Sequence, residues 1–216
     1  MDNKEVFNTL NEIKSLMEKS SKILTLSGMS AIFVGIYACI AAVISYYILG
    51  GEWVLAGGFI ELPQLNVNTP YKLRLVLIFA SLLIILCLAT VFLFSYRKAK
   101  RNKQRFVFDR TAKRLLWSFF LPMITGGILC LSLIWHQHYG MTSSIMLIFY
   151  GIALINVSSY TYSNTRYLGY FQLLIGLADS FIEGYALLFW TLGFGIAHIV
   201  YGIFFYLKYD RKNYKM

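Results

Sequence analysis

Asn156, Gln172 and His198 are polar side chains inside long apolar stretches, and together they could bind a small solute or carry a proton. Amides donate and accept hydrogen bonds, and the charge of an imidazole changes near neutral pH. If the helices turn near Asn164 and Gly184, the three lie at similar depth, roughly 10–15 Å from one end of the helices at 1.5 Å per residue. We therefore expect them to cluster.

A second interpretation makes the same side chains hydrogen-bonding contacts between helices, which small residues bring close together. Residues three, four and seven apart share a helix face. Five residues of one stretch share such a face: Gly169, Gln172, Gly176, Asp179 and Glu183. Four residues of the last stretch do so too: Thr191, Gly195, His198 and Gly202. Both interpretations, ligand site and helix contact, remain open at this point.

Four further side chains near the other end of the helices suggest a metal site. His136 and His138 end one apolar stretch, and Asp179 and Glu183 end another. Imidazole and carboxylate groups suit a divalent transition metal, although side chains of both kinds are also common at membrane interfaces. No second intramembrane His is present to pair with His198 as an axial ligand, so we expect no haem and no other cofactor.

The composition indicates what kind of elements must position these residues. The chain has 216 residues, of which 58% are hydrophobic and 14% charged, with a mean hydropathy of +0.60. A soluble domain carries roughly 25% charged residues, and long runs without charge are typical of transmembrane helices. The sequence predicts an all-α, polytopic transmembrane helix bundle in one domain, 23–207. Its six spans are expected at about 23–49, 73–96, 115–135, 143–162, 167–182 and 185–207.

Small residues along the first predicted span indicate close helix packing. They are Gly28, Ala31, Gly35, Ala38 and Ala42. Before this span, a heptad-like apolar pattern predicts a short amphipathic cytoplasmic helix over 1–22. Its apolar positions are Val6, Leu10, Ile13 and Met17. That helix could pack on its own domain, join a second protomer in a homo-oligomer, or simply lead into the first span. Residues 208–216 form a basic cytoplasmic tail.

The basic residues predict the orientation. Of the 20 Lys and Arg residues, 18 fall on one side of the six-span topology, nine of them in the loop 97–114. Lysines and arginines in short loops mark the cytoplasmic side, so both termini are expected there, in a bacterial cytoplasmic (inner) membrane. The loop from Arg97 to Arg114 could also bind anionic lipid headgroups. Topology explains the net charge of +10 without a nucleic-acid partner.

Three parts of the chain resemble a family of uncharacterised bacterial six-helix integral membrane proteins. They are the run 155–169, the run 184–202 around Phe194, Gly195 and His198, and the segment 17–35. The resemblance covers most of the chain. It implies the fold and brings no activity, substrate or site residue with it.

Catalysis is the function class with least support, because the sequence has no metalloprotease, nucleophile-elbow or phosphate-loop motif. His198 is essentially the one ionisable group expected deep in the bilayer, and such groups mark transport pathways. We favour small-solute or proton-linked transport or binding. The alternative is a non-transporting accessory or regulatory membrane protein that acts through helix faces and cytoplasmic contacts.

Overall fold

The computed structural model describes residues 27–49, 69–101, 110–136, 138–182 and 184–211, and in these ranges the chain is helical without strands. The predicted N-terminal helix, most of the tail and the middle of the loop 97–114 lie outside them. The helices are α2 (Gly28–Leu49), α3 (Thr69–Arg101), α4 (Arg110–Trp135), α5 (Thr142–Val157) and α6 (Thr165–Phe181), with a short η1 (Tyr139–Met141) before α5. One continuous segment follows, made of α7 (Ala186–Trp190), η2 (Thr191–Ala197), α8 (His198–Phe205) and η3 (Tyr206–Asp210).

Four helices of the described chain are long and apolar enough to cross a membrane: Gly28–Ile48, Arg74–Arg101, Arg110–Trp135 and Ala186–Asp210. This confirms the prediction of a helical membrane protein. Helix α5, with 16 residues, and α6, with 17, are shorter. The fourth predicted span runs to Tyr162, whereas α5 ends at Val157 and turns follow.

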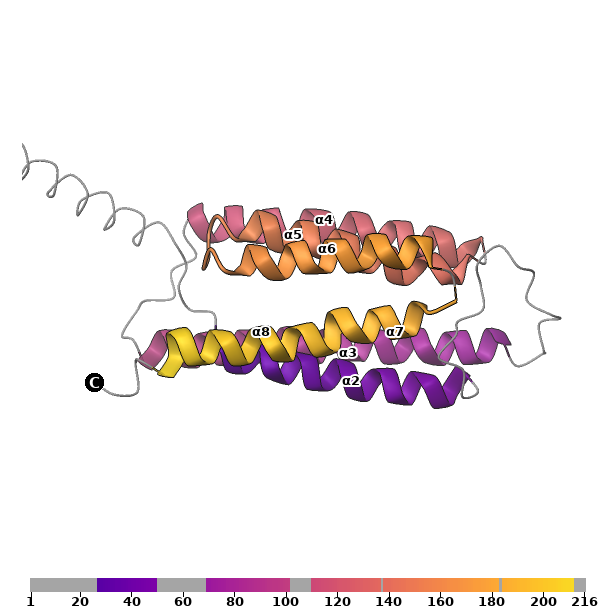
Figure 1. The fold of residues 1–216 in the computed structure, drawn as a ribbon, viewed down its shortest axis with the longest axis horizontal. Coiled ribbons are helices and arrows are strands. Elements are labelled where there is room, and N and C mark those ends of the chain that lie inside the picture. The colour runs from indigo at the N-terminus through magenta and orange to yellow at the C-terminus, as the bar shows by residue number, and fades with distance from the viewer. Residues whose placement is uncertain (1–26, 50–68, 102–109, 137, 183, 212–216) are drawn as a thin grey trace, which may run out of the picture.

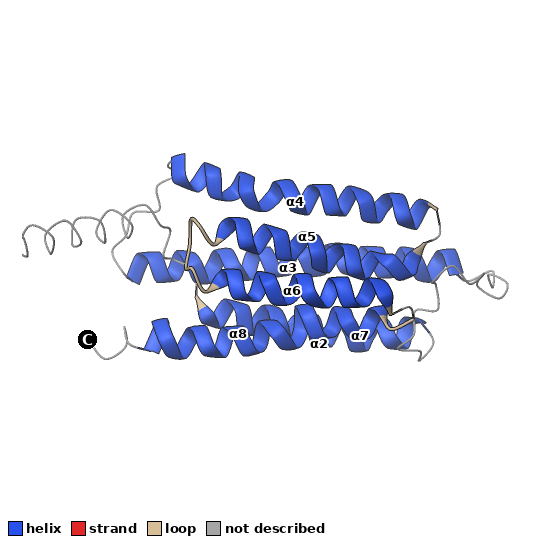
Figure 2. Ribbon diagram, turned by 45° about the horizontal axis from the view of Figure 1, so that its top comes forward, coloured by secondary structure: helices blue, strands red, loops and turns tan. Residues whose placement is uncertain are grey.

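The helices form two layers (Figure 1) and run along one common axis (Figure 2). The first layer consists of α4, α5 and α6, where α5 packs on both neighbours. The second layer consists of α2, α3 and the segment Ala186–Asp210, where α2 packs on both of the others. We call the interface between these layers the seam. In the second layer the first described helix thus lies beside the last one.

Glycines set the spacing of helices within each layer. A Cβ atom on Gly151 of α5 would lie 2.7 Å from the carbonyl oxygen of Gly169 on α6. A Cβ atom on Gly35 of α2 would lie 2.7 Å from the carbonyl oxygen of Gly195. Real Cβ atoms do not come so close, so only glycine permits these backbone contacts. The close packing predicted for the small-residue face of α2 is confirmed.

Large apolar side chains cover the outside of the bundle. They include Ile78, Leu82, Ile85, Phe92, Trp117, Ile128, Leu174 and Val200, all exposed. A water-soluble monomer rarely exposes so much contiguous apolar surface. A hydrocarbon solvent around the helices accounts for it.

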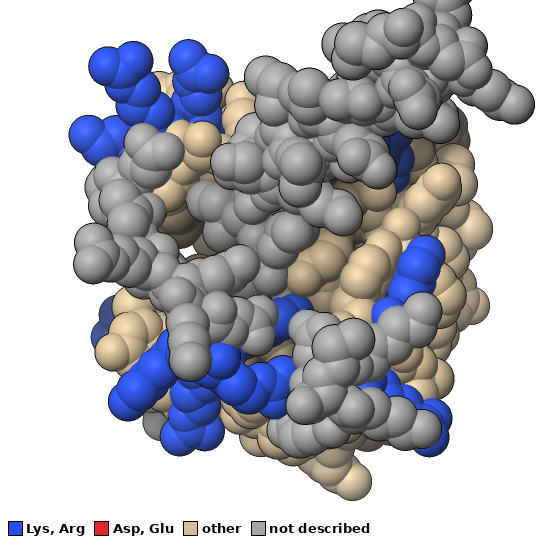
Figure 3. Space-filling model, turned by 90° about the vertical axis from the view of Figure 1, so that its left-hand side faces the viewer, with Lys and Arg blue, Asp and Glu red and all other residues tan. Residues whose placement is uncertain are grey.

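Positive charge gathers at one end of the bundle, where α3 and η3 end and α4 and α6 begin (Figure 3). We call this the basic end. Its described basic residues are Arg97, Lys98, Lys100, Arg101, Arg110, Lys113, Arg114, Arg166, Lys208 and Arg211. The one acidic residue in the described part of this end, Asp210, is buried. Lys72 and Arg74 belong to the start of α3, at the opposite end.

Candidate functional site

The structure brings Gln172 and His198 together in the seam. Gln172, on α6, is fully buried, and His198, the first residue of α8, is 3% exposed. The Gln172 Nε2 atom lies 3.5 Å from His198 Nδ1. Both side chains are therefore shielded from solvent and face each other across the two layers.

Asn156 does not join them, because its side chain is exposed on the last turn of α5. Tyr150 supplies the α5 contact instead, with its hydroxyl 2.8 Å from His198 Nε2. Six positions separate Tyr150 from Asn156, which is about 240° around an α-helix. The two side chains thus point in different directions. Sequence reasoning compared depths without fixing which face of α5 meets the seam, and so missed Tyr150.

A π-helical turn, η2, shapes the backbone of the site. The Gly193 carbonyl accepts a hydrogen bond from Gln172 Nε2 at 2.8 Å and lies 3.0 Å from His198 Nδ1. A carbonyl oxygen can only accept, so Nδ1 carries the proton and His198 Nε2 accepts from the Tyr150 hydroxyl. The approach of Gln172 Nε2 to Nδ1 is then a contact between two donors.

The π geometry also changes which residues share a face. Gly193 and His198 are five positions apart and both face Gln172. Gly195 and Gly202 instead face α2, where added Cβ atoms would meet Cys39 and Ile32. The predicted single stripe is therefore split, because Gly195 and Gly202 pack against α2 whereas the His198 side chain reaches Gln172 and Tyr150.

The carbonyl oxygen of the Gln172 side chain, Oε1, is the unusual atom of the site. It is buried and has no hydrogen-bond partner among the described residues. An unsatisfied buried acceptor costs about 1–3 kcal/mol. A group that donated a hydrogen bond to Oε1 would remove this cost.

Aromatic rings surround His198. Its imidazole stacks on Tyr150 at 5.4 Å and on Phe194 at 6.1 Å between ring centroids, and those two rings lie 5.1 Å apart. Apolar rings exclude water and strengthen the hydrogen bonds they enclose. The site is thus a small polar cluster enclosed by aromatic rings.

Two further polar contacts flank this site along α6. Thr165, Gln172 and Asp179 are all buried and recur every seven positions, which is about 10 Å along the helix. Toward the basic end, the Thr165 hydroxyl lies 3.0 Å from that of Tyr201. Toward the opposite end, Ser144 donates to Asp179 at 3.0 Å. The four described members of the predicted stripe, Gly169, Gln172, Gly176 and Asp179, are buried as expected.

The residues proposed for a metal site do not come together in the described chain. His136 and His138 are exposed, whereas Asp179 is buried in the bundle. Glu183 lies outside the described residues. No group of three or more His, Cys, Asp or Glu side chains in the described ranges could hold a metal ion. The metal site stays a prediction without added support.

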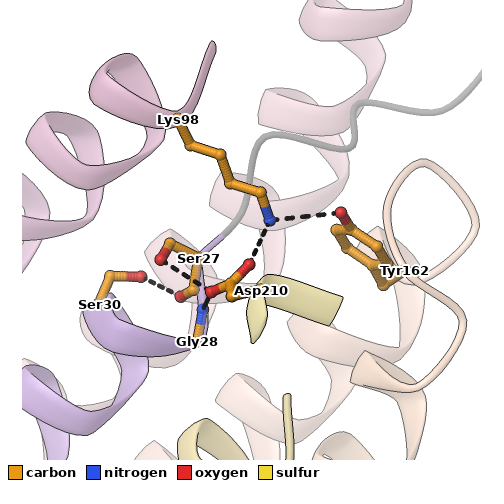
Figure 4. A network of polar contacts seen from close by, with 6 residues as sticks. All are labelled: Ser27, Gly28, Ser30, Lys98, Tyr162 and Asp210. Atoms are coloured by element: carbon orange, nitrogen blue, oxygen red, sulfur yellow. Dashed lines mark hydrogen bonds and ion pairs between the residues drawn. The ribbon is translucent and has the colours of Figure 1, made fainter. Parts of the chain in front are cut away.

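A second polar network, at the basic end, was not foreseen from the sequence (Figure 4). Lys98 Nζ forms an ion pair with Asp210 Oδ1 at 2.7 Å, and both side chains are 5% exposed. The other carboxylate oxygen, Oδ2, accepts from the Gly28 backbone N–H at 2.8 Å and from the Ser27 hydroxyl at 3.1 Å. Asp210 thereby caps the start of α2 and fixes the ends of α3 and η3 to it.

Tyr162, from the connection between α5 and α6, completes this network. Lys98 Nζ donates to its hydroxyl at 3.4 Å and lies 5.3 Å from its ring centroid. The Tyr162 ring also packs at 4.6 Å from the rings of Phe205 and Tyr209. One signal in the sequence could have revealed the network, since Asp210 is an isolated acid among basic residues.

Comparison of the chain with protein-family models, with curated proteins and with solved structures finds no match in any of the three. The resemblance to six-helix bacterial membrane proteins stays a prediction from the motifs.

Proposed function

We propose that this chain is a six-span protein of the bacterial cytoplasmic membrane that binds or transports a small solute at the Gln172–His198 site, with linkage to protons. The observation that carries the proposal is the unpartnered Gln172 Oε1 atom, buried beside His198. A solute with an N–H or O–H group would satisfy it. Among the described residues, no fixed charge belongs to the contacts of this site, which favours an uncharged hydrogen-bond donor.

Proton linkage is proposed from the contacts of His198. Its Nε2 atom accepts from the Tyr150 hydroxyl in the neutral form. When Nε2 gains a proton it becomes a donor, and the hydroxyl oxygen of Tyr150 can accept in turn. The hydroxyl hydrogen then needs a new acceptor, so protonation would alter the polar contacts available to a solute.

Native mass spectrometry with elemental analysis tests this proposal. We expect the wild-type protein, purified in mild detergent, to retain a stoichiometric small solute. Gln172→Met, which removes both amide atoms at similar volume, should lose that solute. The matched control is Asn156→Met, which removes an exposed amide and should retain it.

Two outcomes would contradict the proposal. A wild-type protein that carries only lipid or a second copy of itself would favour the accessory alternative. A solute retained equally by wild type and by Gln172→Met would place the ligand elsewhere. The melting temperature of each variant, measured alongside, separates loss of ligand from loss of folding.

The topology is part of the same proposal, with α5 and α6 as the fourth and fifth spans and both termini cytoplasmic. Segregation of the described basic residues at one end supports it, because Lys and Arg are retained on the cytoplasmic side. Exposed cations there would also attract anionic lipid headgroups, at about 1 kcal/mol for each residue near the surface.

Cysteine labelling in intact cells checks the orientation. A cysteine at Lys100, exposed at the basic end, should resist a membrane-impermeant maleimide until the cells are opened. A cysteine at Trp135, exposed at the opposite end, should react from outside. Labelling of Lys100→Cys in intact cells would overturn the orientation.

A further inference from the structure

Close backbone contacts hold the helices together within each layer, whereas side chains make the contacts across the seam. Within the layers, backbones touch at glycines, as Gly151 and Gly169 do in the first and Gly35 and Gly195 in the second. These contacts fix α5 to α6 and α2 to the last helical segment. Gly126 of α4 lies against Phe149 of α5, and the ion pair of Lys98 with Asp210 ties α3 to the second layer. Each layer is therefore expected to move as one body.

Across the seam, polar contacts occur at successive levels. At the basic end Lys98 donates to Tyr162, and next to it Thr165 bonds to Tyr201. The Gln172–His198 site follows at mid-depth. At the opposite end, Ser143 of α5 donates to the Ala186 carbonyl of α7 at 2.9 Å. Hydrogen bonds thus flank the site on both sides, and apolar contacts such as those of Leu154 and Leu168 with Ala197 also cross the seam.

The buried ion pair lies on one side of this seam. Lys98, Asp210 and Gly28 all belong to the second layer, whereas Tyr162 belongs to the first (Figure 4). Separation of the layers at the basic end would break the 3.4 Å contact with Tyr162 and its ring packing. It would leave the 2.7 Å pair of Lys98 and Asp210 intact. Among the described residues, opening there therefore leaves the buried ion pair in place.

We propose that the two layers are the moving bodies of a carrier, which rock against each other around the Gln172–His198 site. Tyr162, with Lys98 and the Thr165–Tyr201 pair, forms the gate at the basic end, and Ser143 with Ala186 forms the opposite gate. Rocking of one helix bundle against another around a fixed site near mid-membrane is a known physical solution to alternating access. The inference rests on the proposed function, because it concerns access to the same site.

Pairs of spin labels on the full-length chain in lipid nanodiscs test the motion by double electron–electron resonance. The labels replace Arg166 and Lys208 across the seam at the basic end, or Tyr47 and Phe181 across it at the opposite end. All four positions are exposed. The control pair, Trp117 and Tyr167, lies within the first layer. Cys39, Cys87 and Cys130 are first replaced by alanine, and the melting temperature confirms folding.

We expect two distance populations for each cross-seam pair and one for the control pair. Tyr162→Phe and Tyr201→Phe each remove one hydroxyl at the basic-end gate. Because a hydrogen bond of this kind changes an equilibrium by about 2- to 12-fold, each variant should raise the open-to-closed ratio at the basic end by that factor. The open population at the opposite end should fall. Tyr160→Phe, in the same connection but without a cross-seam hydrogen bond among the described residues, should change neither.

A single, unchanged distance at both ends in all variants would overturn the inference. So would an increase at both ends together, which would mean a loosened bundle, or a change in the control pair. None of these results depends on a ligand. A rigid protein that nevertheless retains a solute would therefore reject the carrier motion and leave the proposed binding function standing.

Discussion

Lys98→Met is expected to lower the free energy of unfolding by about 3–5 kcal/mol, because removal of one partner leaves the other charge buried and unpaired. Asp210 is 5% exposed and, among the described residues, would keep the Gly28 N–H and the Ser27 hydroxyl as partners. Lys100→Met is the matched control, since Lys100 is exposed two positions along the same helix. It should change stability little. Unfolding in mixed micelles, followed by circular dichroism, measures both.

The double variant Lys98→Met/Asp210→Asn distinguishes charge from packing. The amide oxygen of the substituted side chain can still accept from the Gly28 N–H, while both charges are gone. Replacing a buried ion pair by neutral groups is often close to neutral. We expect the double variant to recover most of the stability lost in Lys98→Met. If the double variant instead lost as much stability as the two single variants together, Lys98 and Asp210 would not be coupled, and this explanation would be wrong.

Gly169→Ala is expected to lower stability by about 1–3 kcal/mol, the usual penalty for overpacking a tight contact. The new Cβ atom would lie 2.8 Å from the Gly151 carbonyl oxygen, and backbone cannot rotate away as a flexible side chain does. The α5–α6 pair would have to separate. The melting temperature in detergent and the yield of monodisperse protein measure the effect.

Gly127→Ala on α4 is the control for this substitution, since a Cβ atom there meets nothing within 4 Å. Alanine is favoured over glycine inside a helix by roughly 0.5–1 kcal/mol, so this variant should be neutral or slightly more stable. A loss at Gly127→Ala equal to that at Gly169→Ala would contradict this explanation, because the close approach of α5 to α6 exists only at Gly169.

Several features of the fold could be predicted from the sequence because they depend on local pattern. Charge-free runs indicated membrane helices, and four of them are confirmed as long enough to cross. The small residues at Gly28 and Gly35 indicated a packed face of α2, and the structure places backbone of the last helical segment against it. Patterns of this kind depend on one helix alone, so they can be read without knowing which helix packs against it.

The parts that were not predicted depend on partners and on irregular backbone. Asn156 was placed by depth, but depth does not say which face of α5 meets the seam. His198 was assigned to one stripe with Gly195 and Gly202, but these two glycines pack against α2 and His198 contacts the first layer. Lys98 was counted as a loop residue that sets topology, whereas α3 continues to Arg101 and carries it into a buried pair. Its partner Asp210 lies 112 positions later, beyond the reach of any local pattern.

The contact between the Gly28 N–H and Asp210 has a consequence for the order of assembly. The two residues are 182 positions apart, so α2 is capped only after nearly the whole chain has been made. At a synthesis rate of about 5–20 residues per second, α2 waits roughly 10–40 s for its cap. Helices α4, α5 and α6 are consecutive and can pack as they emerge. The second layer, which contains α2, is thus the first to be started and the last to be completed.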